Sequence, residues 1–266
     1  MFKKMTQQFL GVFNLTIIKK DLVINIDNER KNYRHITQKL NFIFLNERIN
    51  NPYKIYELSK ESTSQIFQDL FVLNETDFKT DGYFIEIGAA DGKYFSNSYI
   101  LEKKFNWKGL VVEPAQVWHK QLKENRDCEI STDCLHEASD MDIEFIETNK
   151  PAFSQIKSIT NSYEDSHQNL RKDIKKKYYI KTKTFNDLLE EYSVQKNIDY
   201  VSIDTEGTEY EILKGINFDK YNISIISVEH NNHNKREKIF NLLTSKNYKR
   251  VQTEFSQFDD WYVLNT

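Results

Sequence analysis

The sequence predicts an α/β domain, a three-layer sandwich in which helices cover both faces of a mostly parallel β-sheet. Short apolar runs rich in β-branched residues alternate with segments whose apolar residues recur every three or four positions. The apolar runs lack polar alternation, which is typical of strands buried on both faces. Because strand–helix alternation favours right-handed parallel crossovers, the sheet is expected to lie between two helical layers.

Five strands are predicted from about residue 62 onward. They are YFIEIGA from Tyr83, GLVVEP from Gly109, CEISTDCL from Cys128, YVSIDT from Tyr200 and SIISVEH from Ser224. Helical periodicity lies between them, in NSYILEKKF, AQVWHKQLKEN, FNDLLEEYS and TEYEILKGI. The runs DIEFIE and YYIKTKT are predicted as extra edge strands. The last two runs, NYKRVQTEF and DDWYVLNT, have hairpin spacing, so the sheet should finish with an antiparallel strand.

Composition excludes several classes of protein. The 266 residues carry a net charge of −3 with acids and bases interspersed, so no nucleic-acid partner is indicated. No stretch reaches the ~20 apolar residues of a membrane span. We expect a cytoplasmic protein, with interfacial binding of the first segment, MFKKMTQQFLGVFNLTII, left open. Residues 1–58 are predicted as a mainly helical extension that packs on the main domain, 59–266, or on a second copy in a homo-oligomer.

The first predicted strand ends in an unusual turn, Gly88-Ala89-Ala90-Asp91-Gly92. Glu86 and Asp91 place carboxylates near it, whereas the phosphate-binding patterns GxxxxGK[ST] and GxGxxG are absent. A turn rich in acids suits a ligand with a cationic part and hydroxyls. Glu113 ends the second strand, where an acid accepts ribose hydroxyls in dinucleotide folds. Its alternative role is that of an acid at a helix N-terminus.

The third predicted strand ends near Asp133 and Cys134, where an adenine edge could be bound. Nucleoside recognition without a diphosphate cradle indicates S-adenosylmethionine, whose sulfonium and ammonium groups would lie near the acids of the turn.

These motifs together resemble the FkbM-type S-adenosylmethionine-dependent methyltransferases over roughly residues 64–262. The resemblance rests on SQIFQDLFVL, on the long segment from GYFIEIGAADG to KGLVVEP, on IDYVSIDTEGTEYEILKGINFD, on ISVEHN and on DDWYV. It implies a class I methyltransferase (Rossmann-like) fold, with a mostly parallel seven-stranded sheet that ends in an antiparallel hairpin. It also implies methylation of oxygen, often on sugars or natural products. At Asp133 and Cys134 this chain departs from the small residue that the family usually has at the adenine.

The resemblance also implies a set of cofactor-binding residues. These are Glu86, Gly88, Ala89, Asp91, Gly92, Ser96, Asn97, Glu113, Pro114, Asp133, Cys134 and Asp204. Gln65 and Asp69, upstream, would lie near the lip of the cofactor site.

The acceptor side is predicted where the fourth and fifth strands end. Asp204 ends one, and Glu229 and His230 end the other, so the three should converge over one crevice. Two hypotheses stay open. Asp204 or His230 is the general base that takes the proton of the acceptor hydroxyl, or Asp204, Glu229 and His230 hold a divalent metal such as magnesium. Glu206 is a further candidate for the site.

The predicted function is therefore O-methyl transfer to a hydroxyl of a saccharide or of a glycosylated or lipid-like metabolite. The acceptor pocket is expected to be formed by residues Pro151 to Lys177 and by part of residues 1–58. Candidate contacts are Tyr163, His167 and the basic cluster of Arg171, Lys172, Lys175, Lys176 and Lys177. A non-catalytic binding or assembly module is the alternative. An NAD-dependent oxidoreductase is less favoured because the GxGxxG pattern is broken.

Overall fold

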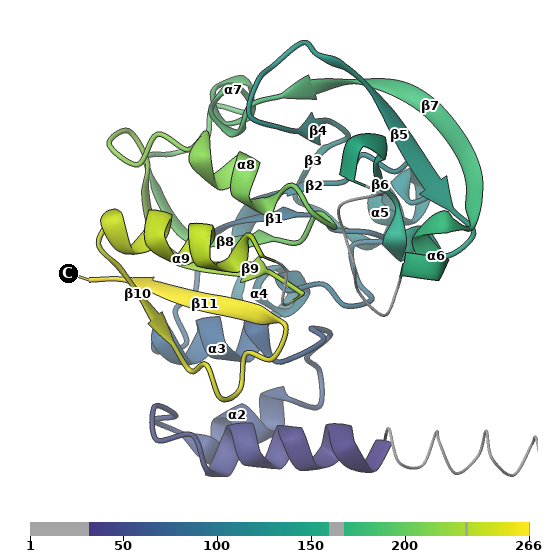
Figure 1. Cartoon of the computed structure of the whole chain (residues 1–266). Coiled ribbons are helices and arrows are strands. Elements are labelled where there is room, and N and C mark those ends of the chain that lie inside the picture. Colours follow the sequence, from purple (N-terminus) through teal and green to yellow (C-terminus); the bar gives the residue numbers. More distant parts are fainter. Residues whose placement is uncertain (1–31, 160–167, 232–233, 266) are drawn as a thin grey trace, which may run out of the picture. The chain divides into compact units, whose positions relative to one another are not determined.

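The computed structural model describes residues 32–159, 168–231 and 234–265 (Figure 1). The chain divides into two compact units, Met1–Pro52 and Tyr53–Thr266. In the first unit, residues 32–44 are helical. The second unit contains every strand described below. None of the helices in the described ranges is both long and apolar enough to cross a membrane.

The larger unit is built on a seven-stranded sheet with the order β10-β11-β9-β8-β1-β2-β3. β11 pairs antiparallel with both of its neighbours, and the other pairs in the sheet are parallel. This is the class I methyltransferase fold, so the predicted sheet and its antiparallel strand are confirmed. The strands are β1 (Tyr83–Ile87), β2 (Lys108–Val112), β3 (Glu129–Ser131), β8 (Asn197–Ile203), β9 (Asn222–Glu229), β10 (Tyr248–Val251) and β11 (Asp259–Leu264).

Helices cover both faces of this sheet, with α8 and α9 on one face and α3 and α4 on the other (Figure 1). The predicted helical segments between the strands are confirmed as α4, α5, α7 and α8. The helices are α2 (Pro52–Leu58), α3 (Gln68–Glu75), α4 (Tyr99–Phe105), α5 (His119–Asn125), α6 (Gln168–Lys172), α7 (Phe185–Glu191), α8 (Glu209–Lys214) and α9 (Arg236–Ser245).

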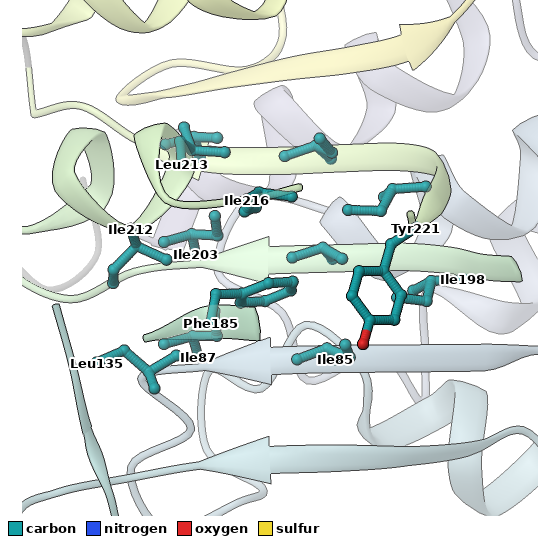
Figure 2. Close-up of a cluster of buried hydrophobic side chains, with 14 of the residues drawn as sticks. Ile85, Ile87, Leu135, Phe185, Ile198, Ile203, Ile212, Leu213, Ile216 and Tyr221 are labelled. Atoms are coloured by element: carbon teal, nitrogen blue, oxygen red, sulfur yellow. The ribbon is translucent and has the colours of Figure 1, made fainter. Parts of the chain in front are cut away.

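Strand alternation assigns each side chain to one of the two layers. Ile85 and Ile87 of β1 belong to the core under α7, α8 and α9, together with Phe185, Ile203 and Ile212 (Figure 2). Because successive strand residues point to opposite faces, Glu86 must face the layer that holds α3 and α4.

The same alternation operates at the other end of the sheet. Tyr262 of β11 joins the core under α7, α8 and α9. Its neighbour Trp261 is fully buried and stacks on Phe71 of α3, with 4.6 Å between ring centroids. Trp261 is therefore a core residue of the last strand.

A second, four-stranded sheet has the order β4-β7-β5-β6. Its strands are β4 (Cys134–Leu135), β5 (Asp142–Thr148), β6 (Gln155–Ile156) and β7 (Ile174–Lys183). DIEFIE and YYIKTKT are strands, as predicted. Their expected place at a sheet edge was wrong, because they pair with each other in this second sheet. A further prediction was also wrong. CEISTDCL is not one strand, because the Asp133 carboxylate accepts bonds from Ser131 and Lys183 in a turn between β3 and β4.

Candidate active site

A cavity of about 560 Å³ opens where β1, β2, β8 and β9 end. Its size falls within the range of about 300–1,000 Å³ that is usual for small-molecule and cofactor sites. The carboxyl ends of parallel strands are where ligands bind in open α/β sheets. Most of the predicted site residues meet in this cavity: Gly88, Ala89, Asp91, Glu113, Pro114, Asp133, Cys134, Asp204 and Glu229 lie on its wall, as do Gln65 and Glu206.

The turn after β1 lies directly against the end of β8. Gly88 has φ +86°, and a Cβ added there would lie 1.6 Å from the carbonyl oxygen of Asp204. Asp204 N–H donates to the Ile87 carbonyl at 3.0 Å, and Gly88 N–H donates to Val112 at 2.9 Å. Only glycine fits this contact, which therefore fixes the floor of the cavity between its two ends.

Glu86 lies behind the turn and is not part of the cavity wall. Its carboxylate accepts bonds from the hydroxyls of Ser96 at 2.8 Å and Ser98 at 2.6 Å, and from Asn97 N–H at 2.6 Å. The buried Arg126 guanidinium lies 3.2 Å away. These bonds tie the start of α4 to β1.

Ser96, Asn97 and Gly92 are likewise outside the described cavity wall. Asn97 Nδ2 donates to Ser202 of β8 at 2.9 Å. A Cβ on Gly92 would lie 2.7 Å from Arg126 Cγ. All three residues thus belong to the packing that supports the turn. Asp69, near the predicted lip, is also buried away from the wall, where Ser62 and Ser64 donate to it.

Glu113 connects the turn to the end of β2. Its two carboxylate oxygens accept N–H bonds from Ala90 at 2.8 Å and from Ala115 at 2.7 Å. Burial raises the pKa of Glu113 to about 7, although the hydrogen bonds from the two backbone N–H groups act to lower it. Since each carboxylate oxygen has two lone pairs, both can still accept a ligand hydroxyl.

Asp91 has a local role in the same turn. Its Oδ1 accepts the N–H groups of Lys93 at 2.9 Å and of Tyr94 at 2.7 Å. These bonds close the turn over the next residues, and Asp91 still lies on the cavity wall.

Three carboxylates meet at the opposite end of the cavity. Asp204, Glu206 and Glu229 each offer an oxygen, and these oxygens lie within 4.8 Å of one another. Burial raises the pKa of Asp204 to about 7, with the charge of Asp259 adding to the effect. Burial and the neighbouring Asp204 raise the pKa of Glu206 to about 8, and both also raise that of Glu229.

We call Asp204, Glu206 and Glu229 the acceptor corner. A buried cation among the described residues faces this corner. Arg171 of α6 is fully buried and pairs with Glu206 at 2.5 Å. Glu229 Oε2 is buried without a hydrogen-bond partner among the described residues. The corner therefore keeps more acidic groups than Arg171 neutralises.

His230 does not join the acceptor corner. Its side chain is 1% exposed and is absent from the described cavity wall, and its Nε2 lies 3.7 Å from Asp260 Oδ1. Burial lowers the pKa of His230. The structure thus groups Glu206, not His230, with Asp204 and Glu229, because successive residues at the end of β9 point to opposite faces.

Sequence reasoning missed much of the remaining wall. Tyr94 and Phe95, which are 67% and 44% exposed, line the cavity beside the turn. Phe145 of β5 and residues 149–154 line it from the second sheet. Pro151 to Ile156 fall within the stretch predicted for the acceptor, whereas Tyr163 and His167 lie outside the described residues. No site prediction covered residues 145–150, although 142–147 were predicted as a strand, because their position at the cavity depends on the pairing of β5 with β7.

Comparison with known proteins places this geometry in a family. No curated protein sequence matches the chain. The fold is similar to a precorrin-6y C5,15-methyltransferase from Geobacter metallireducens, at 11% identity and TM-score 0.38, over 73% of this chain and 86% of that one. It is also similar to a TehB-like SAM-dependent methyltransferase from Corynebacterium glutamicum, at 6% identity and TM-score 0.41, over 82% and 98%.

The family model described as the methyltransferase FkbM domain matches residues 86–263, which include the turn, Glu113 and the acceptor corner. The chain therefore belongs to the FkbM methyltransferase family and is an S-adenosylmethionine-dependent methyltransferase.

Proposed function

We propose that this protein transfers a methyl group to a hydroxyl of a saccharide or of a glycosylated or lipid-like metabolite. The observation that carries the proposal is the presence of three adjacent carboxylates, one buried and two half-buried, in the same cavity as the glycine turn and Glu113. A hydroxyl is a weak nucleophile until it loses its proton, and carboxylates with raised pKa values are suited to accept that proton near neutral pH.

The turn end of the cavity fits S-adenosylmethionine. Gly88 leaves the backbone open to close approach, and Glu113 has lone pairs left for the two ribose hydroxyls. Asp133, Pro114 and Cys134 lie beyond it on the wall, at the predicted adenine position. Asp91 and Asp204 supply negative charge for the cationic methionine part. When bound, the cofactor supplies a methyl group activated by its sulfonium.

Glu86, Gly92, Ser96 and Asn97 act on the cofactor through the turn in this proposal. Their hydrogen bonds and packing hold the turn at the end of β1, and none of them needs to touch the ligand. A displaced turn would move Gly88 away from Asp204, so these residues position the cofactor site.

The acceptor corner also fits a divalent cation such as magnesium. Carboxylate oxygens are the ligands that hard cations prefer, and Glu229 Oε2 is buried without a described hydrogen-bond partner. Asp204, Glu206 and Glu229 would hold the ion, and His230 would not. A cation at this position lowers the pKa of an acceptor hydroxyl.

Asp204 is the base of this proposal when no ion is bound. Its pKa of about 7 allows it to exchange a proton near neutral pH, and a carboxylate oxygen of Glu229 lies within 4.8 Å of one of its own. Arg171 fixes Glu206 and so defines one wall of the acceptor corner.

The test is a mass-shift screen of the purified protein with S-adenosylmethionine and glycans or glycolipids from its host. We expect one acceptor class to gain a single methyl group at a hydroxyl, with release of S-adenosylhomocysteine. A chelator should lower turnover, and magnesium should restore it. Methylation found only on nitrogen or carbon would refute the oxygen assignment, and full turnover in excess chelator would refute the metal.

A further inference from the structure

The helix over residues 32–44 carries an exposed apolar stripe. Tyr33, Ile36 and Leu40 are 75%, 54% and 42% exposed. Residues spaced by three and four positions lie on one side of a helix. Phe42, which is about 150° from the centre of the stripe, is fully buried, so the opposite side of the helix is packed. Ile43, three positions after Leu40, is also fully buried and ends the exposed stripe near the last turn. The stripe is therefore additional apolar surface that faces solvent.

Basic side chains flank this stripe. At about 100° per residue, Arg34 and Lys39 fall roughly 90–130° to either side of its centre. Residues 32–46 contain no Asp or Glu. Long basic side chains beside an apolar surface can reach outward to anionic groups while their stems cover the apolar edge.

The net charge of the chain also differs between the segment that contains this helix and the rest of the chain. Residues 1–48 contain nine Lys and Arg against four Asp and Glu, a net charge of +5. Residues 49–266 contain 28 bases against 36 acids, a net charge of −8. The partner of the stripe must therefore combine an apolar layer with negative charge.

A second copy of the helix does not meet this requirement. In a symmetric helix pair, Arg34 and Lys39 would face like charges, and residues 32–46 offer no acid to pair with them. A different surface of a second copy would need an apolar patch. The other exposed large apolar side chains described outside residues 33–56 are Tyr94, Phe95, Ile174 and Tyr179, and two of these line the cavity.

We propose that the helix over residues 32–44 binds the surface of an anionic lipid bilayer. Tyr33, Ile36 and Leu40 enter the boundary between headgroups and acyl chains, and Arg34 and Lys39 contact lipid phosphates. The helix lies along the surface, in keeping with the absence of a membrane-crossing helix from the described ranges. This binding is independent of the methyl-transfer chemistry.

The test is sedimentation of the full-length protein with vesicles. Vesicles of phosphatidylcholine and phosphatidylglycerol in equal parts should bind it, pure phosphatidylcholine should bind it more weakly, and added salt should weaken the binding further. Ile36→Gln with Leu40→Gln removes apolar surface without changing charge and should lower the partition coefficient about tenfold or more. Tyr179→Gln, at a 74% exposed residue of β7, is the matched control and should bind like the wild type.

Three results would overturn the proposal. They are no binding to the anionic vesicles, equal binding by the Ile36→Gln/Leu40→Gln variant, and a wild-type dimer in light scattering that this variant converts to a monomer without any vesicle binding. Circular dichroism and S-adenosylhomocysteine affinity should be unchanged in the variant, which separates lost lipid binding from lost folding.

Discussion

Two buried glutamate–arginine pairs lie on the two sides of the cavity floor, and their surroundings differ. Below the turn, Arg126 lies between Glu86 and Glu102, and Glu86 also accepts bonds from Ser96, Asn97 and Ser98. At the acceptor corner, Arg171 pairs with Glu206, which has Asp204 and Glu229 as its nearest acids.

This difference distinguishes a scaffold from a reactive site. Every charge below the turn has hydrogen-bond donors or an opposite charge, as buried groups require. The acceptor corner gathers three acids around one guanidinium, and burial raises the pKa values of Asp204, Glu206 and Glu229. An excess of buried acid costs stability, and it is suited to proton transfer or to a cation.

The largest effect is expected from Asp204→Asn. The amide cannot accept the acceptor proton and is a poorer ligand for a cation, so turnover should fall by about 10²–10⁴-fold. The measurement is the turnover rate of wild type and variant with the acceptor found in the mass-shift screen. The S-adenosylhomocysteine affinity of both proteins shows whether the cofactor site is intact. His230→Ala is the comparison, with at most a small loss expected. If His230→Ala were the more damaging change, the placement of the chemistry at the acceptor corner would be wrong.

The second prediction compares the stability of two variants, each of which lacks one of the two buried arginines. Arg126→Leu leaves Glu86 buried without a cation and should cost about 3–5 kcal/mol of unfolding free energy. Arg171→Leu should cost less near neutral pH, because Glu206, with a pKa of about 8, can take up a proton. Urea unfolding of both variants at pH 7 decides the order. Equal losses would remove the distinction between scaffold and site.

Metal binding gives a smaller and more specific contrast. Glu229→Gln should weaken binding of Mn²⁺, used as a probe for magnesium, by about tenfold or more, because an amide oxygen is a weaker ligand than a carboxylate. Glu86→Gln should leave the Mn²⁺ affinity unchanged if the variant folds. Calorimetric titration measures both. Identical affinities in wild type and Glu229→Gln would contradict the proposed ligand set.

The last prediction concerns the pH dependence of stability, which spreads its effect over several pH units. Burial raises the pKa of Asp259 to about 7, with its Gln68 hydrogen bond opposing the shift. The native state therefore holds a proton that the unfolded state loses near pH 4, and stability should fall as pH rises from about 4 to 7, by up to about 1.4 kcal/mol per unit for one such group. Asp259→Asn should flatten the profile over that window. Thermal unfolding of both proteins at a series of pH values tests this. A stability profile of Asp259→Asn that runs parallel to that of the wild type would contradict it.

The features that could be predicted from the sequence are those that depend on neighbouring residues in the chain. The strands β1, β2, β8 and β9 were predictable because each is a continuous apolar run, and their ends brought Gly88, Glu113, Asp204 and Glu229 together. The inward position of Glu86 was also available from alternation with Ile85 and Ile87, although its motif favoured a cofactor contact.

The rest depends on pairing between distant segments. The second sheet requires residues 142–148 to pair with 174–183, and the Arg171–Glu206 contact joins residues 35 positions apart. The lysine-rich sequence of β7 is typical of an edge strand or of a strand with one face in solvent. Such a pattern does not indicate which strand it pairs with.

Calorimetric titration of S-adenosylhomocysteine into the wild type and into Glu113→Gln tests the central claim most directly. That claim is that the glycine turn and Glu113 hold the methyl donor at one end of the cavity. The account predicts one site per chain in the wild type and about tenfold weaker binding in Glu113→Gln, which loses the charged acceptor of the ribose hydroxyls. A folded wild-type protein that binds no S-adenosylhomocysteine, or a Glu113→Gln variant that binds it with unchanged affinity, would contradict the account.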